Sequence, residues 1–389
     1  MKVTQCDIII SGAGMAGLSL LYRAMKDKVW ADKKIIVIDS KLEKTNDKTW
    51  SFWKRSDGPF DFLAYSTWRK LLFFNNGGRK IQLDCGPYVY NSIRSIDFYE
   101  HVLGYLKNCT NINFVESVII SIDSNPDGCT LLTEDARYQC KYAFNSVFNK
   151  PEIKKDDQYM LQHFKGYKIK TKDPLLDSTV AHLMDFRTSQ ENGTSFIYAL
   201  PIKADEIFIE YTIFSKSLLK QHEYDLKIRT YLSDTLMCKD YEVLEEEYGV
   251  IPMTDYEFTR RKENVINIGS IGGDTRGSTG YTFVNTQKTV SEIINSFKQY
   301  GHPFSLKESI GFKEKLYDTT LLNVLAKSNY KGHELFSDLF SGTKASVVFS
   351  FLDAETTLVD DLKIMRSLKV MPFLIAFIFA IKRQLSFRS

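Results

Sequence analysis

A glycine-rich segment near the N-terminus has the residue types and the spacing of a dinucleotide-binding turn. Gly12, Ala13, Gly14 and Gly17 belong to a G-x-G-x-x-G pattern that follows the apolar run DIIIS and precedes a stretch with helical periodicity. In this motif the first glycine permits a tight turn, the second lets the backbone approach a pyrophosphate, and the third allows close helix–strand packing. The helix N-terminus offers N–H groups to the phosphates. Asp39 ends the next apolar run, KIIVID, where its carboxylate can accept from ribose hydroxyls.

A second glycine-rich segment lies late in the chain and favours one dinucleotide over another. The run INIGSIGG carries Gly269, Gly272 and Gly273, and Gly280 follows it directly before Tyr281. Flavoproteins with a single nucleotide domain use such a late segment to hold the ribityl and pyrophosphate groups, whereas a plain nicotinamide dehydrogenase does not need it. The sequence therefore favours FAD over NAD.

Glu210 is a candidate for acid–base chemistry because apolar residues surround it in the run IFIEYTIF. On an alternating strand Phe208 and Glu210 share one face, and Tyr211 points to the other. Such a carboxylate is either exposed on an edge strand or held in an apolar cavity, where burial raises its pKa and keeps it protonated at neutral pH. The residues alone leave both alternatives open.

The elements that position these residues follow from periodicity. We expect a strand–helix–strand unit at the N-terminus and a long functional loop over 41–68. Further expected elements are a helix over 95–107, a β-meander over 113–148 with a turn at 125–128, antiparallel strands within 163–215, a strand over 265–270, a helix over 291–300 and mostly helix from 314 onward.

This order of elements predicts an α/β protein. It would combine an FAD-binding, Rossmann-type domain of the glutathione reductase type with an antiparallel β-sheet substrate domain and a helical C-terminal region. The predicted boundaries are 1–50, 80–160 and 260–300 for the FAD-binding domain, 51–79 and 161–259 for the substrate domain, and 301–389 for the helical region.

Composition excludes several classes of function. The formal net charge of +3 is too small to indicate nucleic-acid binding. The six cysteines form no C-x-x-C pair and no two histidines have metal-ligand spacing, which argues against a zinc or iron–sulfur site. We expect reduced thiols in a cytoplasmic protein, and the early first strand leaves no room for a signal peptide.

The C-terminal region contains an uncharged run, VMPFLIAFIFAI, over 370–381, followed by Lys382, Arg383 and Arg388. As a helix the run would be about 18 Å long, too short for a bilayer core of about 30 Å. It is either a buried core helix or an element that lies in one leaflet with the basic residues on anionic headgroups.

Short segments in the same order along the chain carry a family resemblance. They are NDKTWSFW (46–53), IRSIDFY (93–99), QHFKGY (162–167), MDFR (184–187), FIEYT (208–212), IPMT (251–254), GYTF (280–283) and FLDAET (351–356). Together they resemble the bacterial lycopene β-cyclases. The chain departs from the pattern at Tyr211, Asp274, Gly277 and Ala354.

The resemblance implies a redox-neutral cyclisation of the linear ends of lycopene to β-rings, giving β-carotene by way of γ-carotene. It implies Glu210 and Glu355 as catalytic residues and reduced FAD as the group that stabilises the cation, with NAD(P)H as electron donor. It also implies lycopene and the lipid surface as partners, and a peripheral position on the inner face of the cell membrane. The aromatic side chains Trp50, Phe52, Trp53 and Tyr281 would then face the substrate cation or pack in the core.

Two other functions fit the same residues. An FAD-dependent monooxygenase or dehydrogenase acting on an apolar substrate could use the same fold. A non-catalytic flavoprotein that binds membrane lipids or pigments is the other alternative.

Overall fold

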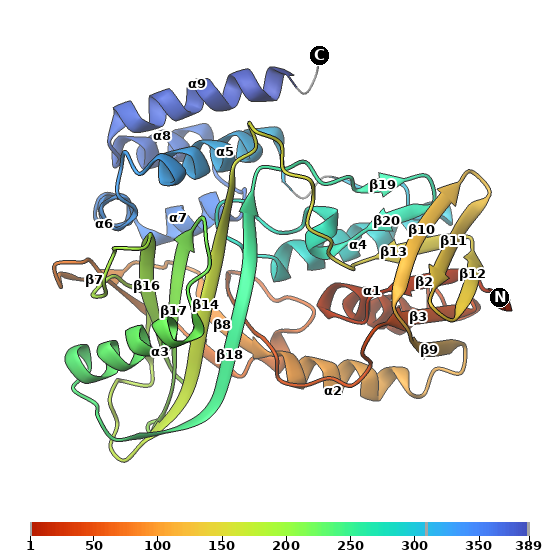
Figure 1. The fold of residues 1–389 in the computed structure, drawn as a ribbon, viewed down its shortest axis with the longest axis horizontal. Coiled ribbons are helices and arrows are strands. Elements are labelled where there is room, and N and C mark those ends of the chain that lie inside the picture. The colour runs from red at the N-terminus through yellow and green to blue at the C-terminus, as the bar shows by residue number, and fades with distance from the viewer. Residues whose placement is uncertain (1, 308–309, 387–389) are drawn as a thin grey trace.

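The computed structural model describes residues 2–307 and 310–386, which form two lobes side by side (Figure 1). The first lobe is built on a six-stranded sheet of order β19-β20-β13-β2-β3-β9. All neighbouring strands in it are parallel except β19 and β20. The strands are β2 (Ile8–Ser11), β3 (Ile35–Asp39), β9 (Ile112–Glu116), β13 (Tyr142–Asn145), β19 (Arg261–Lys262) and β20 (Val265–Asn267).

Three helices pack on this lobe: α1 (Met15–Lys26), α2 (Ser95–Leu106) and α4 (Phe283–Tyr300). Apolar residues of α1, α2 and α4 share one buried core with β2 and β3. The predicted strand–turn–helix–strand unit at the N-terminus and the helix over 95–107 are therefore confirmed. Helix α4 begins at Phe283, earlier than the predicted start at Ser291.

The predicted meander over 113–148 is correct only in its middle part. There β10 (Ile119–Asn125), β11 (Gly128–Thr133) and β12 (Ala136–Cys140) form a four-stranded sheet with β1 (Lys2–Gln5). The turn at 125–128 is confirmed. The flanking strands β9 and β13 instead join the parallel sheet of the first lobe, because such short apolar runs do not reveal which sheet they enter.

The predicted loop over 41–68 is wrong, because this stretch contains strands. β4 (Thr49–Lys54) and β5 (Ser66–Trp68) both pair with β8 (Val89–Arg94), and a short 3-10 turn spans Asp61–Leu63. Trp50 and Phe52 pack against the core of the first lobe, whereas Trp53 is buried in the core of the second. Because both faces of β4 carry large apolar side chains, the strand lacks the alternation that identifies a half-buried one.

The second lobe is a seven-stranded sheet of order β18-β14-β17-β16-β15-β6-β7, antiparallel except between β15 and β6. Its strands are β6 (Lys70–Phe74), β7 (Lys80–Leu83), β14 (Tyr159–Thr171), β15 (Val180–Asp185), β16 (Thr194–Pro201), β17 (Glu206–Ser215) and β18 (Tyr241–Thr254). The boundary predicted at residue 80 falls at β7, which belongs to this sheet. The division into domains otherwise stays a prediction.

Helix α3 (Gln221–Thr230) and the π-helical turn that follows it, Tyr231–Thr235, cover one face of this sheet. Ile207, Ile209 and Tyr211 share a buried cluster with them. Phe208 and Glu210 therefore point to the opposite face, as the alternation along the strand predicts.

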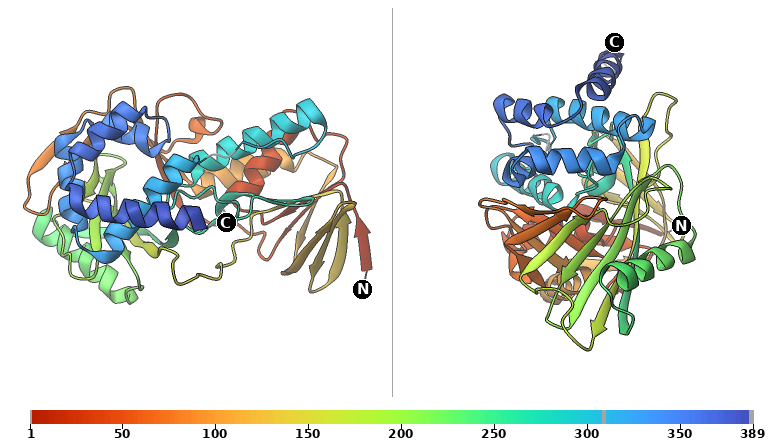
Figure 2. Two further views of the ribbon diagram at one scale, coloured as in Figure 1. Left: turned by 90° about the horizontal axis from the view of Figure 1, so that it is seen from above. Right: turned by 90° about the vertical axis from the view of Figure 1, so that its left-hand side faces the viewer.

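The C-terminal region is helical, as predicted, and lies over the lobe of the seven-stranded sheet, far from the four-stranded one (Figure 2). Its helices are α5 (Phe312–Lys327), α6 (Gly332–Gly342), α7 (Ala345–Leu352), α8 (Leu358–Arg366) and α9 (Val370–Ser386).

Candidate active site

The N-terminal glycine turn has the geometry that a pyrophosphate requires. Gly12 has a φ of +95°, and a Cβ on Gly17 would lie 2.1 Å from the Gly12 carbonyl oxygen, so both positions require glycine. A Cβ on Gly14 would meet no protein atom within 4 Å, so the backbone there is open to a ligand. The Ala13 N–H donates to Asp39 Oδ2 at 2.6 Å, which fixes the turn beside the end of β3.

The late glycine segment is equally constrained. Gly269, Gly273 and Gly280 have φ angles of +66°, +79° and +73°, and a Cβ on Gly272 would lie 2.3 Å from the Asn267 carbonyl oxygen. Only glycine adopts these conformations without strain.

Asp274 anchors that segment from within. Its buried carboxylate accepts from the Gly269 N–H and from the Thr289 hydroxyl, each at 2.6 Å, and pairs with Arg260 at 2.6 Å. The departure from the family pattern at this position thus serves to hold the loop. The sequence offered no signal for it, because Arg260 and Thr289 lie in other elements.

A cavity of about 350 Å³ lies between the two glycine segments and the seven-stranded sheet. We call it the acid cavity. Met15 lines it from the start of α1, Gly280 and Tyr281 from the late segment, Trp50 from β4, and Glu210 from β17. The structure therefore brings Met15 of the N-terminal turn, Ser270 and Gly280 of the late segment and the candidate acid to one cavity.

One row of residues across the sheet defines the chemistry of this cavity. Glu210 of β17 lies opposite Tyr198 of β16 on one side and opposite Gly166 of β14 on the other. Gly166 in turn lies opposite Glu247 of β18. Register partners on neighbouring strands point to the same face, so the tyrosine and the two carboxylates face the cavity together. A Cβ on Gly166 would lie 2.5 Å from the Phe208 ring, so this glycine makes room for an aromatic ring between the acids.

The surroundings of Glu210 favour its neutral form. Burial, followed by repulsion from Glu247, raises the pKa of Glu210 to about 8, although a hydrogen bond from the Thr212 hydroxyl at 2.6 Å opposes this. Burial also raises the pKa of Glu247, which accepts from the Thr49 N–H at 3.0 Å. At neutral pH Glu210 is therefore a proton donor that faces a cavity lined by both aromatic and polar side chains.

Three tyrosines lie next to Glu210, of which Tyr90 is buried and Tyr198 and Tyr281 are partly buried. Tyr90 and Tyr281 approach each other with hydroxyl oxygens 3.5 Å apart, and Tyr198 is the third. Burial raises the pKa of all three phenols, so they stay neutral and present their rings and hydroxyls to the cavity.

Sequence reasoning missed Glu247, Tyr90 and Tyr198. Glu247 ends the run Glu-Glu-Glu over 245–247, which is typical of a solvated surface. The alternation of apolar residues along β16 could have placed Tyr198 on a cavity face, but only the strand register places it beside Glu210.

The predicted aromatic residues divide between the cavity and the core. Trp50 lines the acid cavity and stacks on Phe283 with centroids 5.6 Å apart. Phe52 lies in the core and stacks on the same Phe283 ring. Trp53 packs against Tyr281 with centroids 4.2 Å apart.

Glu355, the second predicted catalytic residue, does not line the cavity that contains Glu210. It lies outside the residues that line the acid cavity, where it pairs with Arg55 and, at 3.8 Å, with Lys288. The nearby Asp353 is more enclosed: it accepts from the Trp53 indole N–H at 2.7 Å, and burial raises its pKa to about 6.

The residues that follow the uncharged C-terminal run do not act as one basic group. Arg383 is buried and pairs with Asp157 at 2.7 Å and Asp255 at 3.0 Å, so it does not make the headgroup contact that one of the two alternatives for this region required. It instead attaches α9 to the ends of β14 and β18. Lys382 is exposed, and Arg388 lies outside the described residues.

Residues 2–307 and 310–386 contain no group of three or more histidine, cysteine or acidic side chains arranged to hold a metal ion. Within the same ranges no helix is both long and apolar enough to cross a bilayer.

Solved structures with the same fold are flavoenzymes and their relatives. A geranylgeranyl bacteriochlorophyll reductase-like protein from Thermoplasma acidophilum superposes with a TM-score of 0.66 at 9% identity, covering 97% of this chain and 100% of that one. The p-nitrophenol 4-monooxygenase from Pseudomonas putida superposes with a TM-score of 0.57 at 12% identity, and the match covers 100% of this chain and 98% of that one. Klebsiella pneumoniae HpxO complexed with FAD and uric acid superposes with a TM-score of 0.56 at 13% identity, and the match covers 94% of this chain and 98% of that one.

At such identities the likeness shows the fold, which is the α/β fold of FAD-dependent enzymes with its Rossmann-type domain, as predicted. The amino-acid sequence then shows to which family of flavoenzyme-like proteins the chain belongs. The chain belongs to the lycopene cyclase protein family, whose model matches residues 7–377, and this confirms the predicted resemblance. No curated protein sequence matches the chain significantly.

Proposed function

We propose that this protein is a flavin-dependent lycopene β-cyclase. The observation that carries the proposal is the position of Glu210, a carboxyl group whose pKa burial raises to about 8, in a cavity that Met15 of the N-terminal turn and Gly280 also line. Membership of the lycopene cyclase family supplies the substrate class.

The proposed reaction adds one proton and removes another, with no net redox change. Glu210 donates its proton to the terminal double bond of the linear polyene, leaving a tertiary carbocation. A neighbouring double bond attacks that cation, so one C–C bond closes the ring and the charge moves into the ring. Loss of a different proton then forms the ring double bond and restores neutrality.

The cavity wall suits this chemistry. Trp50 and Tyr281 present aromatic rings that can stabilise the cation, and Glu247 places a second carboxyl group on the same face. Glu247 lies one strand beyond Gly166 and so faces the cation from the other side of the Phe208 ring. We assign it the stabilising role and keep Glu210 as the acid.

We assign FAD as the cofactor and NAD(P)H as its reductant. Gly12, Gly14 and Gly17 with Asp39 would hold the adenosine pyrophosphate, and the loop over 269–273 would hold the ribityl chain. Reduced FAD bound there supplies negative charge that stabilises the cation without being consumed.

Replacing Gly14 with valine tests the cofactor assignment. The open space at this Cβ predicts that the variant folds, because no protein atom lies within 4 Å. The added side chain would instead occupy the path of the pyrophosphate, so we expect loss of bound flavin with an unchanged circular dichroism spectrum. Retention of FAD at the parental ratio would remove this segment from the cofactor site.

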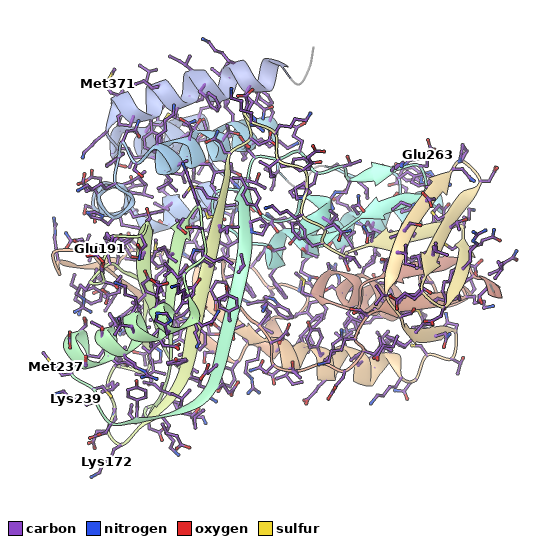
Figure 3. The ribbon with its side chains drawn as sticks, in the orientation of Figure 1. Lys172, Glu191, Met237, Lys239, Glu263 and Met371 are labelled. Carbon is purple, nitrogen blue, oxygen red and sulfur yellow. The ribbon has the colours of Figure 1, made fainter. Side chains whose placement is uncertain are left out.

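We further propose that the protein lies on the inner face of the cell membrane. Met371, Ile375 and Ile378 form an exposed apolar stripe on the outer side of α9, and Met371 points away from the helix bundle (Figure 3). Leu358 and Leu362 on α8 are exposed as well. An apolar face of this extent favours the boundary between headgroups and acyl chains.

The experiment that tests the function uses the purified holoenzyme with lycopene in liposomes, FAD and NADPH. We expect β-carotene, with γ-carotene as the intermediate, and no stoichiometric use of NADPH or O₂. Consumption of one NADPH and one O₂ per product would identify a monooxygenase instead. Recovery of lycopene alone, from protein with bound reduced FAD, would contradict the cyclase proposal.

A further inference from the structure

A second cavity, of about 330 Å³, lies between the seven-stranded sheet and the C-terminal helices. Its walls are mostly leucine, phenylalanine and methionine side chains of β15 to β17 and of α5 to α9. Among the described residues that line it, Asp318 is the only charged one. That carboxylate is already bonded by Arg276 Nε at 2.8 Å and by the Ser278 hydroxyl at 2.7 Å. The cavity therefore suits a hydrocarbon ligand.

The inner end of this cavity shares a wall with the acid cavity. Gln162, Tyr198, Thr279 and Tyr281 line both of them. Since Tyr198 is the register partner of Glu210, the junction lies beside the proposed acid. An extended ligand in the second cavity would therefore have one end at the side chains that separate it from Glu210.

The outer end of the cavity reaches the protein surface between α8 and α9. Met365, Val370 and Leu374 line the cavity and are at the same time 41%, 66% and 47% exposed. These residues border the apolar stripe that we propose to contact the membrane. The cavity thus runs from the surface between α8 and α9 to the wall that it shares with the acid cavity.

We propose that this second cavity is a channel for a linear, apolar polyene chain, which enters from the bilayer between α8 and α9. The channel holds the part of the chain that is not reacting, while the terminal double bond lies at Glu210. The proposal rests on the proposed function for the role of Glu210. The binding of an apolar polyene in the channel can be tested without any reaction.

The two cavities would then have separate roles, one in binding the hydrocarbon chain and one in protonating its end. Burial of a long hydrocarbon supplies binding free energy along the whole chain, whereas protonation involves only its end. An apolar ligand that dwells in a bilayer also reaches such a channel without crossing water.

The test measures binding of cis-parinaric acid, a linear tetraene that fluoresces in apolar sites, to the lipid-free holoenzyme. Leu339 lines the channel from α6 and is partly buried, so Leu339→Trp should obstruct it. We expect the affinity for the probe to fall by about tenfold with bound flavin unchanged. Lycopene should displace the probe from the parental protein.

A matched pair on α9 tests the entrance. Leu374 and Ile378 lie one turn apart and are 47% and 48% exposed, but only Leu374 lines the channel. Leu374→Trp should slow association of the probe several-fold, whereas Ile378→Trp should leave its association rate and affinity unchanged. If Leu339→Trp loses flavin or unfolds, this pair decides the question.

Each outcome separates the channel from the cyclase activity. Parental affinity in a flavin-loaded Leu339→Trp variant, or equal slowing in both α9 variants, would overturn the channel even if the parental protein forms β-rings. Conversely, the expected binding pattern in a protein that forms no rings would refute the cyclase proposal and leave the channel in place.

Discussion

The acid cavity and the apolar channel share a wall but are built in different ways. Strands β4, β16, β17 and β18, with two glycine segments, line the acid cavity, and its acids lie in fixed register across the sheet. Helices contribute most of the channel wall, with bulky side chains that differ in size and exposure. The comparison indicates that the sheet fixes the positions of reacting groups, whereas the helices shape a space for hydrocarbon.

The first prediction tests whether the reacting acid belongs to the acid cavity and not to the channel. Glu210→Gln keeps the size of the side chain but removes the proton that alkene protonation requires. We expect ring formation to fall by about 10²–10⁴-fold while flavin and probe binding persist. Pigment chromatography beside a flavin spectrum measures both.

Tyr211→Phe is the matched control for this substitution. Tyr211 lies next to Glu210 in the chain but is buried against α3, on the other face of the sheet. The Tyr211→Phe variant should therefore retain most of the ring-forming activity. If Glu210→Gln forms β-carotene at near the parental rate, Glu210 is a structural residue and the acid lies elsewhere.

A pH profile sharpens the assignment of the two carboxylates. The reaction needs protonated Glu210, whose pKa is raised to about 8, so the rate should be steady near neutrality and fall as the pH rises through about 8. Repulsion from Glu247 contributes to that rise, so Glu247→Gln should lower the pKa of Glu210 and move the falling limb to lower pH.

Glu247→Gln should also reduce the rate below this limb by about tenfold, because one negative charge no longer faces the cation. A merely structural Glu247 would change stability without moving the pH profile. An unchanged profile in a folded, flavin-loaded variant would therefore contradict the assignment.

Sequence patterns reveal local features of this site better than features that arise between strands. Gly12, Gly14 and Gly17 are recognisable because the turn, its ligand and its strand lie within a few residues of one another. The face of Glu210 likewise follows from alternation along a single strand. Glu247 escapes notice because its burial depends on the Thr49 segment and on Gly166, far away in the chain.

The C-terminal region shows the same limit. The uncharged run over 370–381 indicates a helix, and α9 confirms it. Its composition cannot show that the helix has two apolar sides, one packed on the protein and one exposed. Nor can it show that Arg383, directly beyond the run, is buried with Asp157 and Asp255.

The last prediction concerns Glu355 and has the smallest expected effect. Its carboxylate pairs with Arg55 and Lys288 outside the residues lining either cavity, and it is about one-third exposed. Ion pairs of this kind contribute about 0–1 kcal/mol to stability. We therefore expect Glu355→Gln to change the rate of ring formation by less than about twofold and to leave flavin binding intact.

Asp353→Asn provides the comparison for this substitution, because Asp353 accepts from the indole of Trp53, a residue of the channel wall. It should raise the KM for lycopene more than it lowers kcat, since it disturbs the binding wall and not the acid. If Glu355→Gln instead lost as much activity as Glu210→Gln, the reacting groups would extend beyond the acid cavity. The sheet would then not be the sole source of catalytic carboxylates, and Glu355 would regain the role that the family resemblance implies.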